Sequence, residues 1–315
     1  MFWLSCLIIV GLVLLYFGAD GLVKGSASAA LKLGLTPLVV GLTVVAYGTS
    51  MPELIVSVQA VLAGQSGIAV GNVVGSNIFN IALILGTAAL IYPITVSSQL
   101  IKIDVPIMIG VTLLALFFFR DGVLARWEAA VLFTGIIAYT VGSLIYAKRM
   151  PSAVIVDEPK DGGQSAASPF WKDIAFIIGG LVLLVFGSRF LVEGAIGIAR
   201  TWGVSEAIIG LTIVAAGTST PELAASIVAA LKKQPDIAIG NIVGSNIYNI
   251  LCILGVTGLI APINTGGVAW TDMFVMLGIS LLLLPVLWSG FKIQRWEGGV
   301  LIAIYAGYLA YLWPK

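Results

Sequence analysis

Two glutamates, Glu53 and Glu222, lie in the middle of apolar segments of this 315-residue chain, and each segment is long enough to cross a lipid bilayer. They belong to nearly identical motifs, AYGTSMPELIV at residues 46–56 and AAGTSTPELAA at residues 215–225. An ionised carboxylate inside a bilayer is costly unless it is compensated, so such residues generally mark ion or proton pathways. For one isolated residue, a protonated glutamate or one bonded to a neighbouring helix is the alternative. Two copies in matching motifs favour a pathway.

The residues around each glutamate provide further oxygen atoms that could bind a cation. Proline has no N–H group, so Pro52 leaves the carbonyl of Gly48 without its helical partner, and Pro221 does the same to Gly217. Each motif also carries two hydroxyls, which belong to Thr49, Ser50, Thr218 and Ser219. Carboxylate, carbonyl and hydroxyl oxygens are hard ligands, which suit Ca²⁺ or Na⁺ and not soft metals.

A second motif follows each glutamate: GNVVGSNIFN at residues 71–80 and GNIVGSNIYN at residues 240–249. Glycines four residues apart let helices approach closely, which explains the glycines but not the polar residues. Ser76 and Asn80 share a helix face because they are four residues apart. The same holds for Ser245 and Asn249. We expect these four side chains to complete an oxygen cage around the two glutamates.

The charge of such a cage indicates what it could do. Two ionised glutamates carry two negative charges, which one Ca²⁺ or two Na⁺ would neutralise. An uncompensated pair of charges resists enclosure in a dry, closed state. Competition of the two ions for one site, with the empty site unable to change sides, is what a cation exchanger requires.

The composition is that of a membrane protein. Hydrophobic residues make up 59% of the chain and charged residues only 10%, and a soluble domain could not bury so much apolar surface. The net charge of +1, without a basic block, argues against nucleic acid as a partner. With no histidine and only two cysteines, Cys6 and Cys252, neither a disulfide framework nor a histidine-based metal set is expected. No nucleophile–base pair accompanies the glutamates, so we expect neither an enzyme nor a cofactor.

The second half of the chain repeats the first. A single constant shift in numbering, here called the repeat offset, carries Glu53 onto Glu222. It aligns residues 41–86 with residues 210–255 without a gap, and the two stretches agree at 29 of 46 positions. The same offset relates the sequence RWE at Arg126 to RWE at Arg295. The duplication therefore extends over nearly the whole chain.

Apolar runs between polar, glycine and proline residues predict an all-α polytopic membrane protein with ten transmembrane helices. The predicted spans are 2–20, 36–63, 68–91, 104–119, 127–147, 173–191, 205–231, 237–261, 272–289 and 296–313. Five spans in each half mean that the second half enters the membrane from the opposite side, which gives two inverted repeats with helices broken at the midplane. The predicted units are a first repeat at 1–147, a linker at 148–172 and a second repeat at 173–315.

The lysines and arginines in the loops predict the orientation. With the N-terminus outside, 11 of the 16 lysines and arginines lie on the inner side and 5 on the outer side, as the positive-inside rule requires. Both termini are then outside and the linker is cytoplasmic. The lipid bilayer and the transported ions are the partners that the sequence implies, and no protein partner is implied.

The doubled motifs resemble the paired alpha-repeats of the calcium/cation antiporter superfamily. GTSMPE with GNVVGSNIFN, and GTSTPE with GNIVGSNIYN, are most similar to those of the prokaryotic sodium/calcium exchangers. The resemblance covers the whole chain and implies an integral protein of the prokaryotic plasma membrane, a secondary active antiporter that exchanges Na⁺ for Ca²⁺ by alternating access. In this family the first and sixth helices slide over a core of the second, third, seventh and eighth helices.

The resemblance also implies a role for each residue of the cage. It places Ca²⁺ between Glu53 and Glu222, assisted by backbone oxygens of Thr49 and Thr218. The Na⁺ sites that it implies are formed by Ala46, Ser50 and Ser76 with Glu53, and by Ala215, Ser219 and Ser245 with Glu222, with Asn80 and Asn249 lining the centre.

One residue departs from the pattern of some family members, which have an aspartate where this chain has Asn249. The cage then holds two carboxylates and not three, which leaves the sodium stoichiometry open and argues against potassium dependence. A proton-driven Ca²⁺ antiporter is the alternative mechanism, although that branch typically carries GNxxE motifs in place of GTSxPE. A passive cation channel is a further alternative, because broken helices and carbonyls also build selectivity filters.

Overall fold

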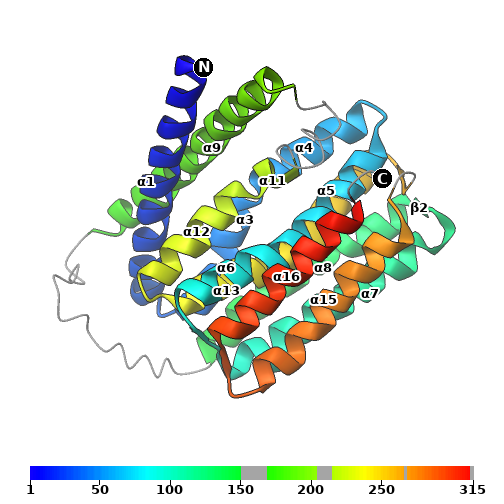
Figure 1. Cartoon of the computed structure of the whole chain (residues 1–315). Coiled ribbons are helices and arrows are strands. Elements are labelled where there is room, and N and C mark those ends of the chain that lie inside the picture. Colours follow the sequence, from blue (N-terminus) through cyan, green and yellow to red (C-terminus); the bar gives the residue numbers. More distant parts are fainter. Residues whose placement is uncertain (150–168, 204–214, 266–267, 313–315) are drawn as a thin grey trace.

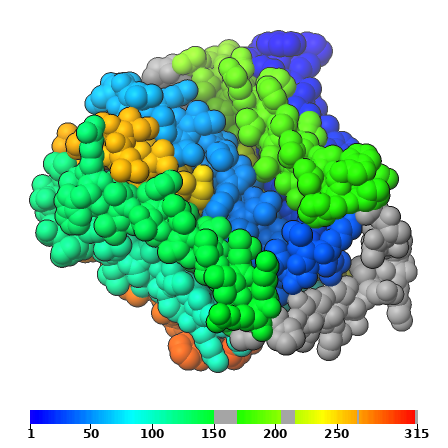
Figure 2. Space-filling view, turned by 180° about the vertical axis from the view of Figure 1, so that it is seen from behind, coloured from blue at the N-terminus to red at the C-terminus, as the bar shows by residue number. Residues whose placement is uncertain are grey.

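The computed structural model describes residues 1–149, 169–203, 215–265 and 268–312, and these are almost entirely helical (Figure 1). The helices lie beside one another, and two long ones, α1 (Phe2–Leu33) and α9 (Phe170–Thr201), form one side of the molecule. Figure 2 shows the same side from behind, with α1 in blue and α9 in light green. The prediction of an all-α architecture is thus confirmed for the described residues, apart from a few very short strands.

α1 and α9 form an antiparallel pair whose backbones are in contact. A Cβ atom built on Gly180 of α9 would lie 2.6 Å from the carbonyl oxygen of Gly18 in α1, so no larger residue fits there. Small residues at such crossings let two helices approach closely. Further along the pair, the Lys32 ammonium near the end of α1 lies 2.5 Å from the buried carboxylate of Asp173 at the start of α9.

Both long helices extend beyond the spans predicted at 2–20 and 173–191. α1 continues through polar residues to Leu33, where Gly34 ends it in the left-handed conformation with φ 64°. Glycine adopts this conformation without a steric penalty, which makes it a common helix terminator. The predicted boundaries were too short because a polar residue in an otherwise apolar run does not end a helix.

The segments that carry the two glutamates are helices broken at a serine. The first consists of α2 (Pro37–Val40), a π-helical turn (Gly41–Val45), α3 (Ala46–Thr49) and α4 (Met51–Leu62). The second consists, in the described residues, of α11 (Ala215–Thr218) and α12 (Thr220–Leu231). The break at Ser50 bends the first segment by 44°. Each helix begins again with a proline, Pro52 or Pro221, in its first turn, where the missing N–H has no helical partner to lose.

Each broken helix is followed by a long helix that contains a π-helical turn. The first consists of α5 (Ser66–Phe79), the turn Asn80–Leu85 and α6 (Gly86–Ile91). The second consists of α13 (Pro235–Tyr248), the turn Asn249–Ile253 and α14 (Leu254–Ile260). Most of their apolar residues are buried, so these helices form the core. The π-helical turns, which begin at Asn80 and Asn249, were not foreseen, and such turns are frequent at functional sites.

The remaining helices pack around this core. They are a π-helical turn (Leu100–Asp104) that leads into α7 (Val105–Phe118), a 3-10 turn (Phe119–Asp121), α8 (Arg126–Arg149), α15 (Trp270–Trp288) and α16 (Arg295–Leu312). Their outward faces carry large exposed apolar side chains such as Phe117 on α7 and Phe274 on α15. Such a surface suits contact with lipid and not with water.

Two short antiparallel strand pairs connect the halves of the chain. β1 (Ile94–Thr95) pairs with β4 (Lys292–Ile293), and β2 (Val123–Leu124) pairs with β3 (Ile263–Asn264). β1 and β3 are related by the repeat offset, and so are β2 and β4. One strand pair therefore corresponds to the other.

The repeated RWE sequence caps helices across the two halves. Arg126 donates a hydrogen bond to the carbonyl of Ile260 at the end of α14 (3.1 Å), and Arg295 donates to that of Ile91 at the end of α6 (3.4 Å). The glutamate of each RWE accepts a hydrogen bond from the backbone at the start of its own helix, at 2.8 and 2.7 Å. These contacts satisfy terminal groups that a helix leaves unpaired.

Seven of the described helices are long and apolar enough to cross a membrane, and the bent segment Pro37–Leu62 makes an eighth. Two predicted spans remain. The span 205–231 lies partly outside the described residues, and its described part contains the apolar helix α12. The span 296–313 corresponds to α16. The predicted linker at 148–172 also lies mostly outside them, and α8 and α9 extend into its two ends.

Candidate cation site

The two glutamates are buried, each being 1% exposed, and their hydrogen bonds cross between the halves of the chain. The Ser50 hydroxyl donates to Oε1 of Glu222 at 2.7 Å, and the Ser219 hydroxyl donates to Oε1 of Glu53 at 2.8 Å. The hydroxyl of Ser76 lies 3.0 Å from that of Ser219. The two glutamate motifs therefore meet in one place.

This pairing differs from the grouping implied by the resemblance, which places Ser50 with Glu53 and Ser219 with Glu222. Each serine lies at the break of its helix with almost the same backbone, φ −84° and ψ 7° at Ser50 and φ −88° and ψ 8° at Ser219. A residue at a break lies at the end of a half-helix and not along its face, so its side chain reaches the opposite motif. The serines and glutamates lie together, but with exchanged partners.

Two asparagines outside the predicted set hold the glutamate-bearing helices in place. Asn72 donates to the backbone carbonyl of Glu53 at 3.1 Å, and Asn241 donates to that of Glu222 at 3.3 Å. Each also donates to the serine one turn after its glutamate, at 2.9 and 3.0 Å. Both asparagines belong to a GNxVG sequence and are related by the repeat offset, which is the signal that could have identified them.

The threonines of the two motifs bind these asparagines. Thr49 donates to the side-chain oxygen of Asn241 at 3.0 Å, and Thr218 donates to that of Asn72 at 3.4 Å. The Thr49 hydroxyl also lies 3.0 Å from a carbonyl in its own helix. These hydroxyls donate to the framework between the two halves, and each threonine also carries a backbone carbonyl oxygen.

One of the two glycine carbonyls that precede the helix breaks has a partner on α9. The Ser188 hydroxyl donates to the carbonyl of Gly217 at 2.6 Å. The position related to Ser188 by the repeat offset is Ala19 of α1, which has no hydroxyl to offer Gly48. The two halves therefore differ at this contact.

Four asparagines meet at the centre, where the two π-helical turns begin. Asn80 donates to the side-chain oxygen of Asn246 at 3.1 Å, and Asn249 donates to that of Asn77 at 3.0 Å. All four side chains are about 1% exposed. Asn80 and Asn249 belong to the predicted set, whereas Asn77 and Asn246 do not.

Several buried oxygens at this place have no hydrogen-bond partner. Among the described residues, six buried side-chain oxygens lack one, and five of these belong to predicted site residues. They are Oε2 of Glu53, Oε2 of Glu222, Oδ1 of Asn80, Oδ1 of Asn249 and Oγ of Ser245. Buried oxygen acceptors without donors are costly, and hard oxygens of these kinds are ligands that suit Na⁺ or Ca²⁺.

The two remaining residues of the predicted set, Ala46 and Ala215, were expected to contribute their backbone carbonyls. The Ala46 carbonyl accepts from the Ser50 amide at 3.1 Å and lies 3.3 Å from the Thr49 hydroxyl. Ala215 begins α11 directly beside residues outside the described ranges. In the described part of the chain, no three histidine, cysteine, aspartate or glutamate residues come together. The site therefore offers two carboxylates and neutral oxygens, a set that suits Na⁺ and Ca²⁺.

Comparison with known proteins gives a consistent result over the full length. A family model described as "Sodium/calcium exchanger protein" matches residues 3–145 and again residues 172–313, once in each half. The chain is 42% identical to a putative antiporter, CaxA, of Alkalimonas amylolytica over 96% of both chains. It is 35% identical to the sodium/calcium exchanger MaX1 of Methanosarcina acetivorans over 97% of both.

A solved structure shows the same fold. The sodium-calcium exchanger NCX_Mj, from crystals soaked with 2.5 mM Na⁺ and 0.1 mM Ca²⁺, superposes with a TM-score of 0.84 at 32% identity over 98% of each chain. The chain is therefore a transmembrane member of the sodium/calcium exchanger family, within the calcium/cation antiporter superfamily.

Proposed function

We propose that this chain exchanges Na⁺ for Ca²⁺ as a secondary active antiporter, and that the two ions compete for a site between Glu53 and Glu222. The proposal depends on one observation. Each buried carboxylate has one oxygen bound by a serine of the opposite motif and its other oxygen without a partner. Uncompensated buried carboxylates are strongly unfavourable, so the site requires a cation in order to close.

We assign Ca²⁺ to the two carboxylates together with the backbone oxygens of Thr49 and Thr218. The proposed Na⁺ ligands follow the crosswise contacts: Ser50 groups with Glu222, and Ser219 and Ser76 group with Glu53. The further proposed ligands are the carbonyls of Ala46 and Ala215, the hydroxyl of Ser245 and the amides of Asn80 and Asn249. Both ions use the same carboxylates, and one therefore excludes the other.

We infer ten spans in two inverted repeats. The contacts of Asn72 with Glu53 recur at the repeat offset as those of Asn241 with Glu222. The helices α1 and α9 also correspond at this offset, and they run antiparallel. Repeats that place corresponding helices in opposite directions support an inverted arrangement.

In the proposed mechanism, α1 and α9 slide as one unit over the two broken helices and open the site to either side in turn. The glycine contacts and the buried Lys32–Asp173 pair hold the two helices together. The breaks lie against α9. A Cβ on Gly48 would be 2.6 Å from Leu181, and one on Gly217 would be 2.5 Å from Val192.

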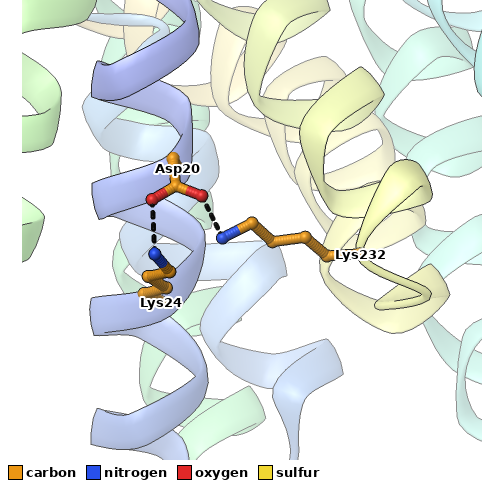
Figure 3. A network of polar contacts seen from close by, with 3 residues as sticks. All are labelled: Asp20, Lys24 and Lys232. Carbon is orange, nitrogen blue, oxygen red and sulfur yellow. Dashed lines mark ion pairs between the residues drawn. The ribbon is translucent and has the colours of Figure 1, made fainter. Parts of the chain in front are cut away.

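The proposed location is the plasma membrane of a prokaryote, with both termini outside. Figure 3 shows a contact that supports one part of this prediction, namely that Lys24 and Lys232 lie on the same side of the membrane. Asp20 of α1 forms ion pairs with Lys24, at 2.7 Å, and with Lys232 at the end of α12. The loop charges place Lys24 and Lys232 on the inner side independently, in different halves of the chain. In the structure they bind one carboxylate.

The experiment that tests the function uses the purified protein in lipid vesicles. Vesicles loaded with Na⁺ should take up radioactive Ca²⁺ when external Na⁺ is removed, and uptake should stop when the gradient is collapsed. Equal uptake driven by a pH gradient without Na⁺ would support the proton-coupled alternative instead. Uptake that needs no counter-ion would indicate a channel.

A further inference from the structure

We infer that Asn77 and Asn246, which are not ligands themselves, fix the direction in which the amides of Asn80 and Asn249 face the cation. This inference rests on the proposed function, because it concerns the centre of the same site. An asparagine side chain has one acceptor end and one donor end of nearly equal size. Which end faces a cation decides between attraction and repulsion.

The direction of Asn77 is set by groups that can only accept hydrogen bonds. Its side-chain nitrogen lies 3.4 Å from the backbone carbonyl oxygen of Asn246 and 3.7 Å from the sulfur of Met276. A carbonyl oxygen and a thioether sulfur have no hydrogen to donate. The nitrogen of Asn77 must therefore lie on this side, and its oxygen on the other.

The direction of Asn249 follows from that of Asn77. The oxygen of Asn77 needs a donor, and the nitrogen of Asn249 supplies it at 3.0 Å. The remaining end of Asn249 is its oxygen, which is buried and has no hydrogen-bond partner. This oxygen is the end left for a cation.

A second relay sets the direction of Asn80. The nitrogen of Asn246 lies 3.6 Å from the sulfur of Met108, which only accepts, so the oxygen of Asn246 faces the other way. That oxygen accepts from the nitrogen of Asn80 at 3.1 Å. The oxygen of Asn80 is again buried and without a partner. The two relays, which share residue Asn246, thus end in two buried side-chain oxygens without a hydrogen-bond partner.

The consequence concerns which ions the centre binds. Two oriented amide oxygens give a neutral oxygen site that attracts Na⁺ or Ca²⁺ and offers no carboxylate to a proton. If either amide turned over, an N–H group would face the cation and repel it. Asn77 and Asn246 are therefore positioning residues, which act on the ion only through Asn249 and Asn80.

The test is a double-mutant cycle on cation affinity in the full chain, with the maximal exchange rate recorded alongside. Asn77→Leu keeps the side-chain size but removes the relay, and we expect it to weaken the apparent Na⁺ affinity by about tenfold, the effect of one hydrogen bond. In a protein that already carries Asn249→Leu, the change Asn77→Leu should weaken the apparent Na⁺ affinity by less than a further factor of about two, because no amide is left to orient. The pair Asn246→Leu and Asn80→Leu should behave alike.

If the double variant of each pair lost as much affinity as the product of its two single variants, the relay would be overturned. Asn77 and Asn246 would then act only through packing. A matched control is Met273→Leu, a buried methionine of the same helix that is not one of the acceptors of the relay, and it should change the affinity by less than about threefold. If one leucine variant does not fold, the other pair supplies the cycle. Absence of Na⁺-driven Ca²⁺ uptake in the unmutated protein would refute the proposed function, a result distinct from multiplicative effects in an active exchanger.

Discussion

The Ser50 hydroxyl donates to Oε1 of Glu222 at 2.7 Å, although the two residues are 172 positions apart in the chain. The contact recurs between Ser219 and Glu53 at 2.8 Å. Each half of the chain thus donates a hydroxyl to the glutamate of the other half, within the proposed ligand groups. A movement that separated the two motifs would break both contacts and disrupt both ligand groups together.

Removing either serine hydroxyl should weaken Na⁺ binding more than Ca²⁺ binding. Ser50→Ala and Ser219→Ala each delete a hydrogen bond to a buried carboxylate, and such bonds contribute about 1.5–3 kcal/mol. We expect the Na⁺ concentration for half-maximal exchange to rise by about tenfold or more. Thr134→Ala is the control, because that hydroxyl is exposed and bonds only within its own helix. Equal losses for the two ions would contradict the assignment of the serines to Na⁺.

A methyl group at the crossing of α1 and α9 should separate the two helices. The Cβ of Gly180→Ala would lie 2.6 Å from a backbone oxygen of α1, which no side-chain rotation relieves. Gly179→Ala is the matched control, because nothing lies within 4 Å of its Cβ. We expect thermal unfolding of the first variant in detergent to occur several degrees lower than that of the second. Similar melting temperatures would mean that the close contact is not needed for stability.

The contact of Ser188 with the Gly217 carbonyl should bias the position of the sliding helices. Sliding of α9 would break this 2.6 Å hydrogen bond. Ser188→Ala removes it and should therefore destabilise the present arrangement relative to the one that opens to the other side. The ratio of the half-maximal Ca²⁺ concentrations on the two membrane faces should change by about three- to tenfold. The measurement compares right-side-out with inside-out vesicles.

The variant Ala19→Ser places a hydroxyl at the position of α1 that corresponds to Ser188 by the repeat offset. We expect it to shift the same ratio in the opposite direction. If both variants leave the ratio unchanged, the bond does not respond to the transport cycle.

Two acidic residues of the paired helices should differ in their effect on stability. Asp20 is partly exposed, and so are Lys24 and Lys232, with which it pairs (Figure 3), so Asp20→Asn should cost less than about 1 kcal/mol. Asp173 is 2% exposed and its carboxylate lies 2.5 Å from the Lys32 ammonium, so replacing it breaks a charge pair that is largely buried. Asp173→Asn should therefore cost about 3 kcal/mol or more. Chemical unfolding in detergent measures both, and high salt should weaken only the effect of Asp20→Asn.

The sequence predicted the features of the site that depend on repetition. The repeat offset identified both glutamates, both proline breaks and both polar helix faces, because a duplicated polar motif in an apolar chain is a strong signal. The sequence also indicated all-α architecture, since the apolar runs are too long for strands. These predictions required no knowledge of how the halves pack.

Features that depend on packing between the halves could not be predicted in this way. The exchange of partners between Ser50 and Ser219 follows from the angle of the breaks, which a sequence pattern does not contain. The roles of Asn77 and Ser188 likewise depend on neighbours far away in the chain. The π-helical turns that begin at Asn80 and Asn249 could not be predicted either, because an apolar helical run reads the same whether one of its turns is α-helical or π-helical.

The most direct test of the account is Ca²⁺ binding to the purified protein, measured by titration calorimetry in detergent without Na⁺. A single cation held between two carboxylates predicts one high-affinity site, which Glu53→Gln and Glu222→Gln each abolish, while Glu193→Gln on the exposed face of α9 leaves it unchanged. Two separate sites, each lost in only one glutamine variant, or unchanged binding in either variant, would contradict a shared site.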